Sequence, residues 1–154
     1  EIGGRVMGLN VHIVKMSKSY SHIRGHAVRM LDDPKEIERS FMRAVTDSGN
    51  EIRFSEDEEK AGVNNLLGIY KVITRKNEKE VEGDFESARG YGDLKRAVAD
   101  VVIEELTPIR KEYEHLMGDI AELDRLLAIG AEHAASISIP KVREMKEKMG
   151  LIVP

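Results

Sequence analysis

A run of helically spaced apolar residues at positions 94–117 is the feature that most constrains the fold of this chain. Apolar side chains recur there at intervals of three and four residues, with charged residues between them: Leu94, Ala97, Val98, Val101, Val102, Leu106, Ile109, Tyr113, Leu116 and Met117. This spacing gathers the apolar side chains on one face of an α-helix, which has to pack against other elements. Pro108 lies inside the run and lacks a backbone donor, so it predicts either one bent helix or two helices.

A shorter helix is predicted to begin after Asp33. Asp33 is a suitable N-cap, and Pro34 fits the first helical position. Ile37, Phe41 and Val45 follow at four-residue spacing, so they should share the buried face. The turn-forming residues 46–49 should then end this helix.

Three further helical patterns cover about residues 63–74, 79–87 and 121–149. In the first of them the inward positions are predicted to be Leu66, Leu67, Tyr70 and Ile73. Pro140 should interrupt the last pattern, and Gly150 should end it. The fold is therefore predicted to be mainly α, an antiparallel helical bundle.

The first thirty-odd residues show a different pattern, typical of short strands and loops. Residues 5–9, 11–14 and 27–31 are short apolar or β-branched runs, which favour extended backbone. Such pieces do not form a stable sheet by themselves. We expect a short strand and loop segment ahead of the helices.

Charge and composition narrow the class of protein. The chain of 154 residues has a net charge of −4, yet residues 1–31 hold five basic residues and one acidic residue, a net charge of +4. This asymmetry favours an anionic ligand near the N-terminal segment. The absence of cysteine excludes disulfides and thiolate metal sites, and no apolar run is long enough to span a membrane. We expect a cytoplasmic protein without a bound structural metal.

The sequence Lys-Met-Ser-Lys-Ser at residues 15–19 carries the clearest chemical signal. Lys15 and Lys18 are compact charges on flexible stems, which can follow phosphate oxygens as charge moves between them. Ser17 and Ser19 favour a turn and can donate hydrogen bonds. The pentapeptide therefore predicts a loop that grips a polyphosphate.

This loop is the nucleotide signature of class I aminoacyl-tRNA synthetases, and the chain resembles the C-terminal part of the bacterial-type tryptophanyl enzymes. The resemblance covers nearly the whole length. It is carried by residues 4–9, 15–19, 31–34, 44–49, 52–54, 64–70, 90–95, 130–132 and 149–151. The Thr-Asp-Ser-Gly turn at 46–49, the Asn-Asn-Leu-Leu-Gly-Ile-Tyr run at 64–70 and the Gly-Tyr-Gly opening at 90–92 narrow it to the tryptophan branch.

The resemblance implies the roles of individual residues. Lys15 and Lys18 are expected to contact the phosphates of ATP as catalytic groups. The expected ATP-binding set is Val6, Lys15, Met16, Ser17, Lys18 and Ser19. Mg²⁺ is expected to arrive bound to ATP, without ligands from the protein.

The resemblance also implies a domain organisation and partners. Residues 1–32 are expected to end a Rossmann-type nucleotide-binding domain, and residues 33–154 to form a helical domain that binds the anticodon part of tRNA(Trp). ATP, tryptophan and a homodimeric partner are expected for the full-length enzyme.

The chain also departs from the family pattern. Residues 10–14 read Asn-Val-His-Ile-Val, where the family has Asp-Pro and a further lysine before the loop. The His-Ile-Gly-His signature of class I enzymes has no counterpart upstream of Lys15, and residues 22–26 lie on the wrong side of the loop with one residue inserted. We therefore expect the chain by itself to be inactive in tryptophan activation.

Two other polar pairs have simpler interpretations. His22 and His26 lack a nearby carboxylate to complete a metal site, and we expect them in a solvent-facing loop. Asn64 and Asn65 are expected to serve the start of a helix rather than to read a base.

Three functions remain from the sequence: part of a tryptophan–tRNA ligase, a stand-alone helical RNA-binding module, or a partner-binding bundle without a nucleotide role. A part of the related tyrosine enzyme is a fourth possibility. The two intact lysines favour the ligase, because a vestigial loop has no reason to keep both charges.

Overall fold

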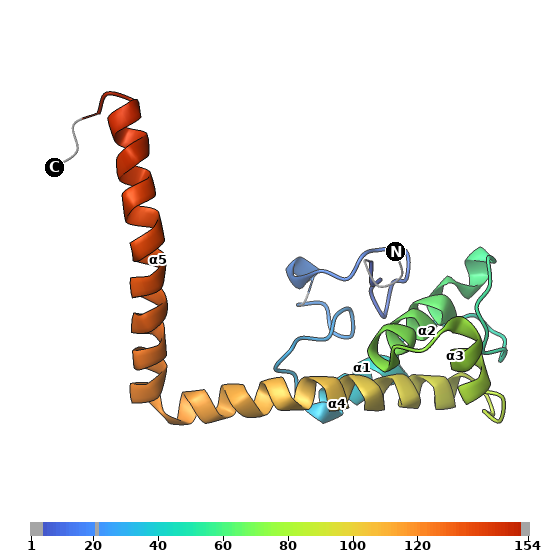
Figure 1. Ribbon diagram of the computed structural model, residues 1–154. Helices are drawn as coiled ribbons and strands as arrows, with labels where there is room; N and C mark the ends of the chain where they lie inside the picture. Colours follow the sequence, from blue (N-terminus) through green and yellow to red (C-terminus); the bar gives the residue numbers. More distant parts are fainter. Residues whose placement is uncertain (1–4, 21, 152–154) are drawn as a thin grey trace. The chain divides into compact units, whose positions relative to one another are not determined.

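The computed structural model describes residues 5–20 and 22–151. Its helices are α1 (Pro34–Met42), α2 (Ala61–Thr74), α3 (Glu78–Asp84), α4 (Tyr91–Gly118) and α5 (Ile120–Lys148), with short 3₁₀ turns η1 (Lys18–Tyr20) and η2 (Glu58–Lys60) (Figure 1). The prediction of a mainly α fold is confirmed. None of the described helices is both long and apolar enough to cross a bilayer.

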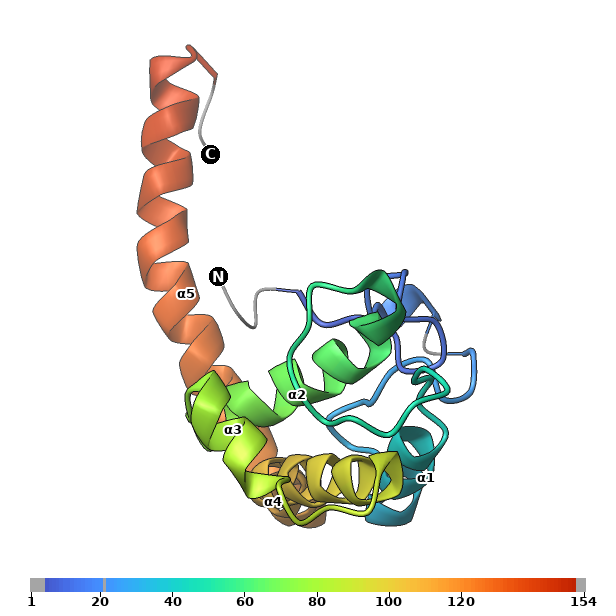
Figure 2. The ribbon, with the colours of Figure 1, turned by 90° about the vertical axis from the view of Figure 1, so that its right-hand side faces the viewer.

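The chain divides into two compact units, residues 1–110 and 111–154. In the first unit, α2 and α3 lie beside the first part of α4 (Figure 2). The buried side chains come from these helices, from α1 and from the segment before α1. The largest fully buried side chains are Phe41, Leu9, Ile37, Leu66, Leu67, Leu94, Val63, Val81 and Val98. Leu9 thus joins the segment before α1 to the helical core. The predicted domain boundary between residues 32 and 33 stays a prediction.

α1 begins as the sequence predicts and ends earlier. The Asp33 carboxylate accepts a hydrogen bond from the Lys35 backbone N–H, and Pro34 opens the helix. Ile37 and Phe41 are buried, but the helix stops at Met42, and the predicted inward position of Val45 is wrong because Val45 is 40% exposed. The backbone N–H of Val45 instead donates to the carbonyl of Leu9, which draws the chain out of the helix.

The short strands predicted before α1 do not form. Met7 and Lys15 make an isolated antiparallel bridge, and no strand occurs within residues 5–20 and 22–151. Residues 27–31, predicted as extended, contain no bridge. A single bridge has too few neighbours to extend into a sheet.

α2 and α3 follow the predicted helices closely. In α2, Leu66 and Leu67 are buried, and Tyr70 and Ile73 pack against the core while partly exposed. α3 is capped by Asn77 and ends at Asp84, three residues before its predicted end.

The prolines within the two long helices do not break them. α4 runs continuously through Pro108, so the alternative of two helices there is excluded. α5 likewise runs through Pro140, which corrects the predicted interruption. Both prolines are exposed, so water can reach the carbonyl that each ring leaves without a helical donor. α5 ends at Lys148, and Gly150, the predicted stop, follows two residues later with a φ of +71°.

Candidate nucleotide loop and its supports

The lysine loop follows directly on the bridge between Met7 and Lys15. The N–H of Gly8 donates to the Val14 carbonyl at 2.8 Å, and the N–H of Met16 donates to the Val6 carbonyl at 2.9 Å. The backbone then turns through η1, where the N–H of Ser19 donates to Ser17 Oγ at 3.2 Å. The predicted loop therefore has a fixed entry at residues 6–8.

Side-chain exposure divides the predicted ATP-binding residues into two groups. Lys15, Lys18 and Ser19 are exposed, whereas Val6, Met16 and Ser17 are half-buried. Met16 packs against the hydrophobic core. Neither lysine forms a side-chain hydrogen bond or ion pair in the part of the chain that the structure describes. Both ammonium groups are thus available to an anionic ligand.

Asn65 of α2 holds the entry of the loop by two hydrogen bonds. Its Oδ1 accepts from the Met7 N–H at 2.9 Å, and its Nδ2 donates to the Met7 carbonyl at 3.0 Å. The other edge of residues 6–8 already bonds to residues 14–16, so the Asn65 amide takes the place of a second neighbouring strand. It connects the loop entry to the helical core.

Asn64 makes the same kind of contact one residue earlier. Its Oδ1 accepts from the Ser55 N–H at 3.1 Å, and its Nδ2 donates to the Ser55 carbonyl at 2.6 Å. Because α2 begins at Ala61, neither asparagine caps the helix, and the expected helix-start role is wrong. Each instead fixes a distant backbone segment against α2.

His26 is a buried residue that follows the lysine loop and contacts the chain before it. It is only 3% exposed, which corrects the expected solvent-facing position, whereas His22 is exposed. The Leu9 N–H donates to the His26 carbonyl at 3.0 Å, and His26 Nδ1 lies 2.9 Å from Asn10 Oδ1. A Cβ on Gly8 would overlap the His26 ring, so a larger residue there would have to displace this buried side chain. The chain before and after the lysine loop is thereby joined.

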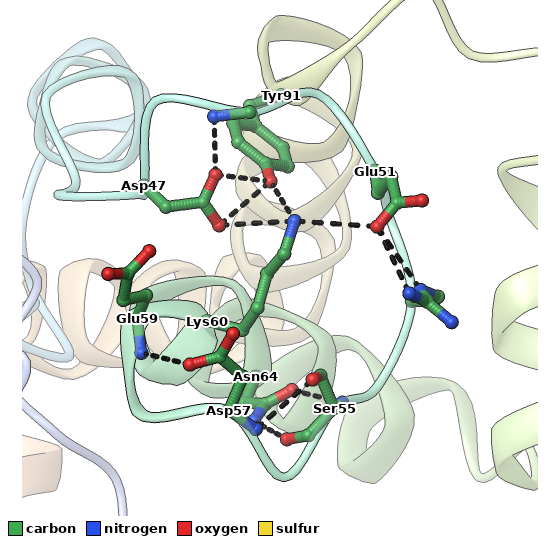
Figure 3. Close-up of polar contacts among 10 residues, drawn as sticks. Asp47, Glu51, Ser55, Asp57, Glu59, Lys60, Asn64 and Tyr91 are labelled. Carbon is green, nitrogen blue, oxygen red and sulfur yellow. Dashed lines mark hydrogen bonds and ion pairs between the residues drawn. The ribbon is translucent and has the colours of Figure 1, made fainter.

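A second polar cluster secures the connection between α1 and α2 to the start of α4. The Tyr91 hydroxyl donates to Asp47 at 2.8 Å and accepts from Lys60 Nζ at 2.9 Å, while Lys60 and Asp47 form an ion pair at 3.3 Å (Figure 3). The Asp47 carboxylate also accepts from the Gly49 N–H at 2.6 Å. This cluster fixes the turn at residues 46–49 in place.

The environment of the cluster shifts its ionisation. Burial alone would raise the pKa of Asp47, but the hydrogen bonds from Tyr91, Gly49 and Lys60 outweigh it and hold that pKa below the ordinary value. Burial raises the pKa of the Tyr91 hydroxyl. Asp47 is therefore a carboxylate and Tyr91 a neutral donor at neutral pH.

The sequence did not predict the side chains that support the loop, and the nucleotide-binding role of the loop stays a prediction. Asn65, His26 and Lys60 each act through a partner 16 or more residues away. The Asn-Asn pair at a half-buried helical position was the one available signal, since a polar side chain there needs a hydrogen-bond partner. Within the described ranges, no group of three or more His, Cys, Asp or Glu side chains could hold a metal ion.

A family model and curated relatives of this chain belong to the same group of tRNA synthetases. Residues 7–107 match the family model described as tRNA synthetases class I (W and Y). The chain is 42% identical to the tryptophan–tRNA ligase of Caldanaerobacter subterraneus subsp. tengcongensis and 40% identical to that of Wolinella succinogenes, over 99% of this chain and 45% of each relative. It thus spans less than half the length of these relatives.

A solved structure has a similar fold. The crystal structure of tryptophanyl-tRNA synthetase from Mycoplasma pneumoniae superposes with a TM-score of 0.78 at 25% identity. The superposition covers 96% of this chain and 44% of that one.

Proposed function

Because this chain belongs to the class I tRNA synthetases of the tryptophan and tyrosine group, we propose that it is the C-terminal part of a tryptophan–tRNA ligase. Such an enzyme activates tryptophan with ATP and transfers it to tRNA(Trp). The curated relatives reported above are tryptophan enzymes, which favours tryptophan over tyrosine as the amino acid. In this proposal the chain supplies the lysine loop and the helices that bind tRNA.

The observation that carries the proposal is the exposed and unpaired state of both loop lysines on a fixed backbone entry. As the tryptophan carboxylate attacks the α-phosphate of ATP, negative charge moves onto the departing pyrophosphate. Lys15 and Lys18 are proposed to stabilise that charge, and oriented cations of this kind contribute strongly to catalysis. Val6, Met16, Ser17 and Ser19 would shape the loop around the nucleotide.

Mg²⁺ belongs in this proposal as part of the substrate. It would reach the site bound to the phosphates of ATP and would neutralise part of their charge. Lys15 and Lys18 suit such a site, since ammonium groups bind phosphate oxygens and do not compete for the metal.

The wider organisation is also proposed by family membership. Residues 1–32 would complete a Rossmann-type nucleotide-binding domain, and residues 33–154 would form the tRNA-binding domain. The complete enzyme would work as a homodimer in the cytoplasm.

The test is Lys18→Ala in the complete ligase of which we propose this chain is part. Tryptophan-dependent exchange of pyrophosphate into ATP should fall by about 100-fold or more, as for loss of a transition-state donor. Lys79→Ala, at an exposed position of α3, is the matched control and should leave the rate unchanged. An undiminished rate for Lys18→Ala would remove the proposed role of the loop.

A further inference from the structure

A basic cleft lies just beyond the lysine loop. It has a volume of about 310 Å³ and is formed by the segment after the loop and by α1. Four arginines line it: Arg24, Arg29, Arg39 and Arg43. His22 lines the same cleft, and its Nδ1 lies 3.1 Å from the carbonyl oxygen of Ser19, the last residue of the loop. The cleft and the loop are therefore neighbours in space as well as in sequence.

The residues that line the cleft carry more positive than negative charges. Two carboxylates, Asp32 and Glu36, stand against the four guanidinium groups. Asp32 is occupied by Arg29, whose Nε lies 2.7 Å from Asp32 Oδ1. The cleft thus has a net positive charge in a chain whose net charge is −4.

The remaining arginines keep most of their donors free. Arg39 uses its Nε for the Lys35 carbonyl at 2.9 Å, which leaves its terminal nitrogens available. The side chains of Arg24 and Arg43 have no hydrogen-bond or ion-pair partner in residues 5–20 and 22–151. Positive charges gathered around one cleft repel one another, and an anion bound between them would relieve that repulsion.

Phosphate is the anion that this arrangement suits best. The planar fork of a guanidinium group matches two phosphate oxygens, and arginine is preferred where phosphate is recognised in this way. The loop lysines already provide cations for a nucleotide, so the cleft offers additional contacts to a ligand with several phosphates. An RNA strand presents phosphates in series.

We propose that this arginine cleft binds the phosphate backbone of RNA. The inference rests on the proposed function in so far as the RNA is tRNA(Trp), and it adds a contact on the loop side of α1. Contacts of this kind set the position of the RNA without reading its bases.

The test measures binding of a tRNA(Trp) transcript to the full chain over a range of salt concentrations. Arg39→Gln combined with Arg43→Gln should weaken binding about tenfold or more in 0.1 M salt. The slope of log K against log salt should become shallower by about two, because each lost phosphate contact contributes about one. The matched control is Arg53→Gln with Arg96→Gln, two exposed arginines outside the cleft, which should leave the slope unchanged.

The outcomes distinguish failure of the cleft proposal from failure of the proposal that the chain is part of a tryptophan–tRNA ligase. If the unmodified chain does not bind the transcript, both proposals fail. If it binds and the cleft variant binds equally well with the same slope, only the cleft proposal fails. Should the variant lose binding of tripolyphosphate and keep that of RNA, the cleft takes a free polyphosphate and the proposal is overturned. Arg24→Gln, which removes no described contact, repeats the test if the double variant does not fold.

Discussion

Replacement of Asn65 by leucine tests whether one side chain of α2 holds the entry of the lysine loop. Leucine has a similar size and makes neither of the two hydrogen bonds to Met7. It also keeps water from the Met7 N–H and carbonyl, which are half-buried. Asn64→Leu is the matched control, because Asn64 makes the same pair of bonds to Ser55.

The size of the effect follows from these contacts. A net hydrogen bond contributes about 1 kcal/mol, and a buried backbone group left unsatisfied costs about 1–3 kcal/mol. Two bonds lost at a half-buried site therefore predict a decrease of about 2–4 kcal/mol in the free energy of unfolding. This is a large share of the roughly 5–15 kcal/mol that stabilises an ordinary domain.

The assay combines urea unfolding with amide hydrogen exchange. Both variants should lose similar stability, but only Asn65→Leu should speed exchange selectively at Gly8 and Met16, whose N–H groups bond across the bridge. Asn64→Leu should act instead around Ser55. Equal protection of Gly8 and Met16 in the two variants, or unchanged stability of Asn65→Leu, would refute the anchoring role.

Two further predictions concern the helical core. Gly62→Ala should lower the free energy of unfolding in urea by about 1–3 kcal/mol or more, because the added Cβ would overlap the Val45 carbonyl oxygen. Gly68→Ala has open space around its Cβ and should raise the free energy of unfolding by about 0.5–1 kcal/mol. The reverse order of stability would contradict the packing. The lowered pKa of Asp47 means that its contribution is complete above the unfolded value near 3.8 and is lost as the pH falls through the lower folded value. Acid unfolding followed by circular dichroism should therefore begin at higher pH after Tyr91→Phe, which removes a hydrogen bond to that carboxylate, and an unchanged midpoint would contradict the assignment.

Local signals in the sequence predicted the helices well. The Asp33 and Pro34 pair located the start of α1, and the apolar spacing identified Leu66, Leu67, Leu94 and other core positions of α2 and α4. These features depend on neighbours within a few residues, where helical geometry is fixed. The lysine motif could be identified for a similar reason, since its residues are contiguous, and its nucleotide-binding role stays a prediction.

Features that depend on distant partners were not predictable in this way. Val45 has the spacing of a helical residue, but its N–H is taken by the carbonyl of Leu9. The buried position of His26 depends on Leu9, Asn10 and the missing side chain of Gly8. Short apolar runs at residues 5–14 look like strands, yet one edge is filled by an asparagine amide from α2.

The hydrogen bonds of Leu9 and Asn10 to His26 close residues 10–26 into a loop whose two ends are held together. The conformational entropy lost when Leu9 and Asn10 meet His26 is already lost on folding. A nucleotide that captures Lys15 and Lys18 would have to restrain only the interior of this loop, and the surrounding helices need not rearrange. If these contacts to His26 were broken, nucleotide binding would have to order a longer free segment and would be weaker, although the charges of the loop would be unchanged.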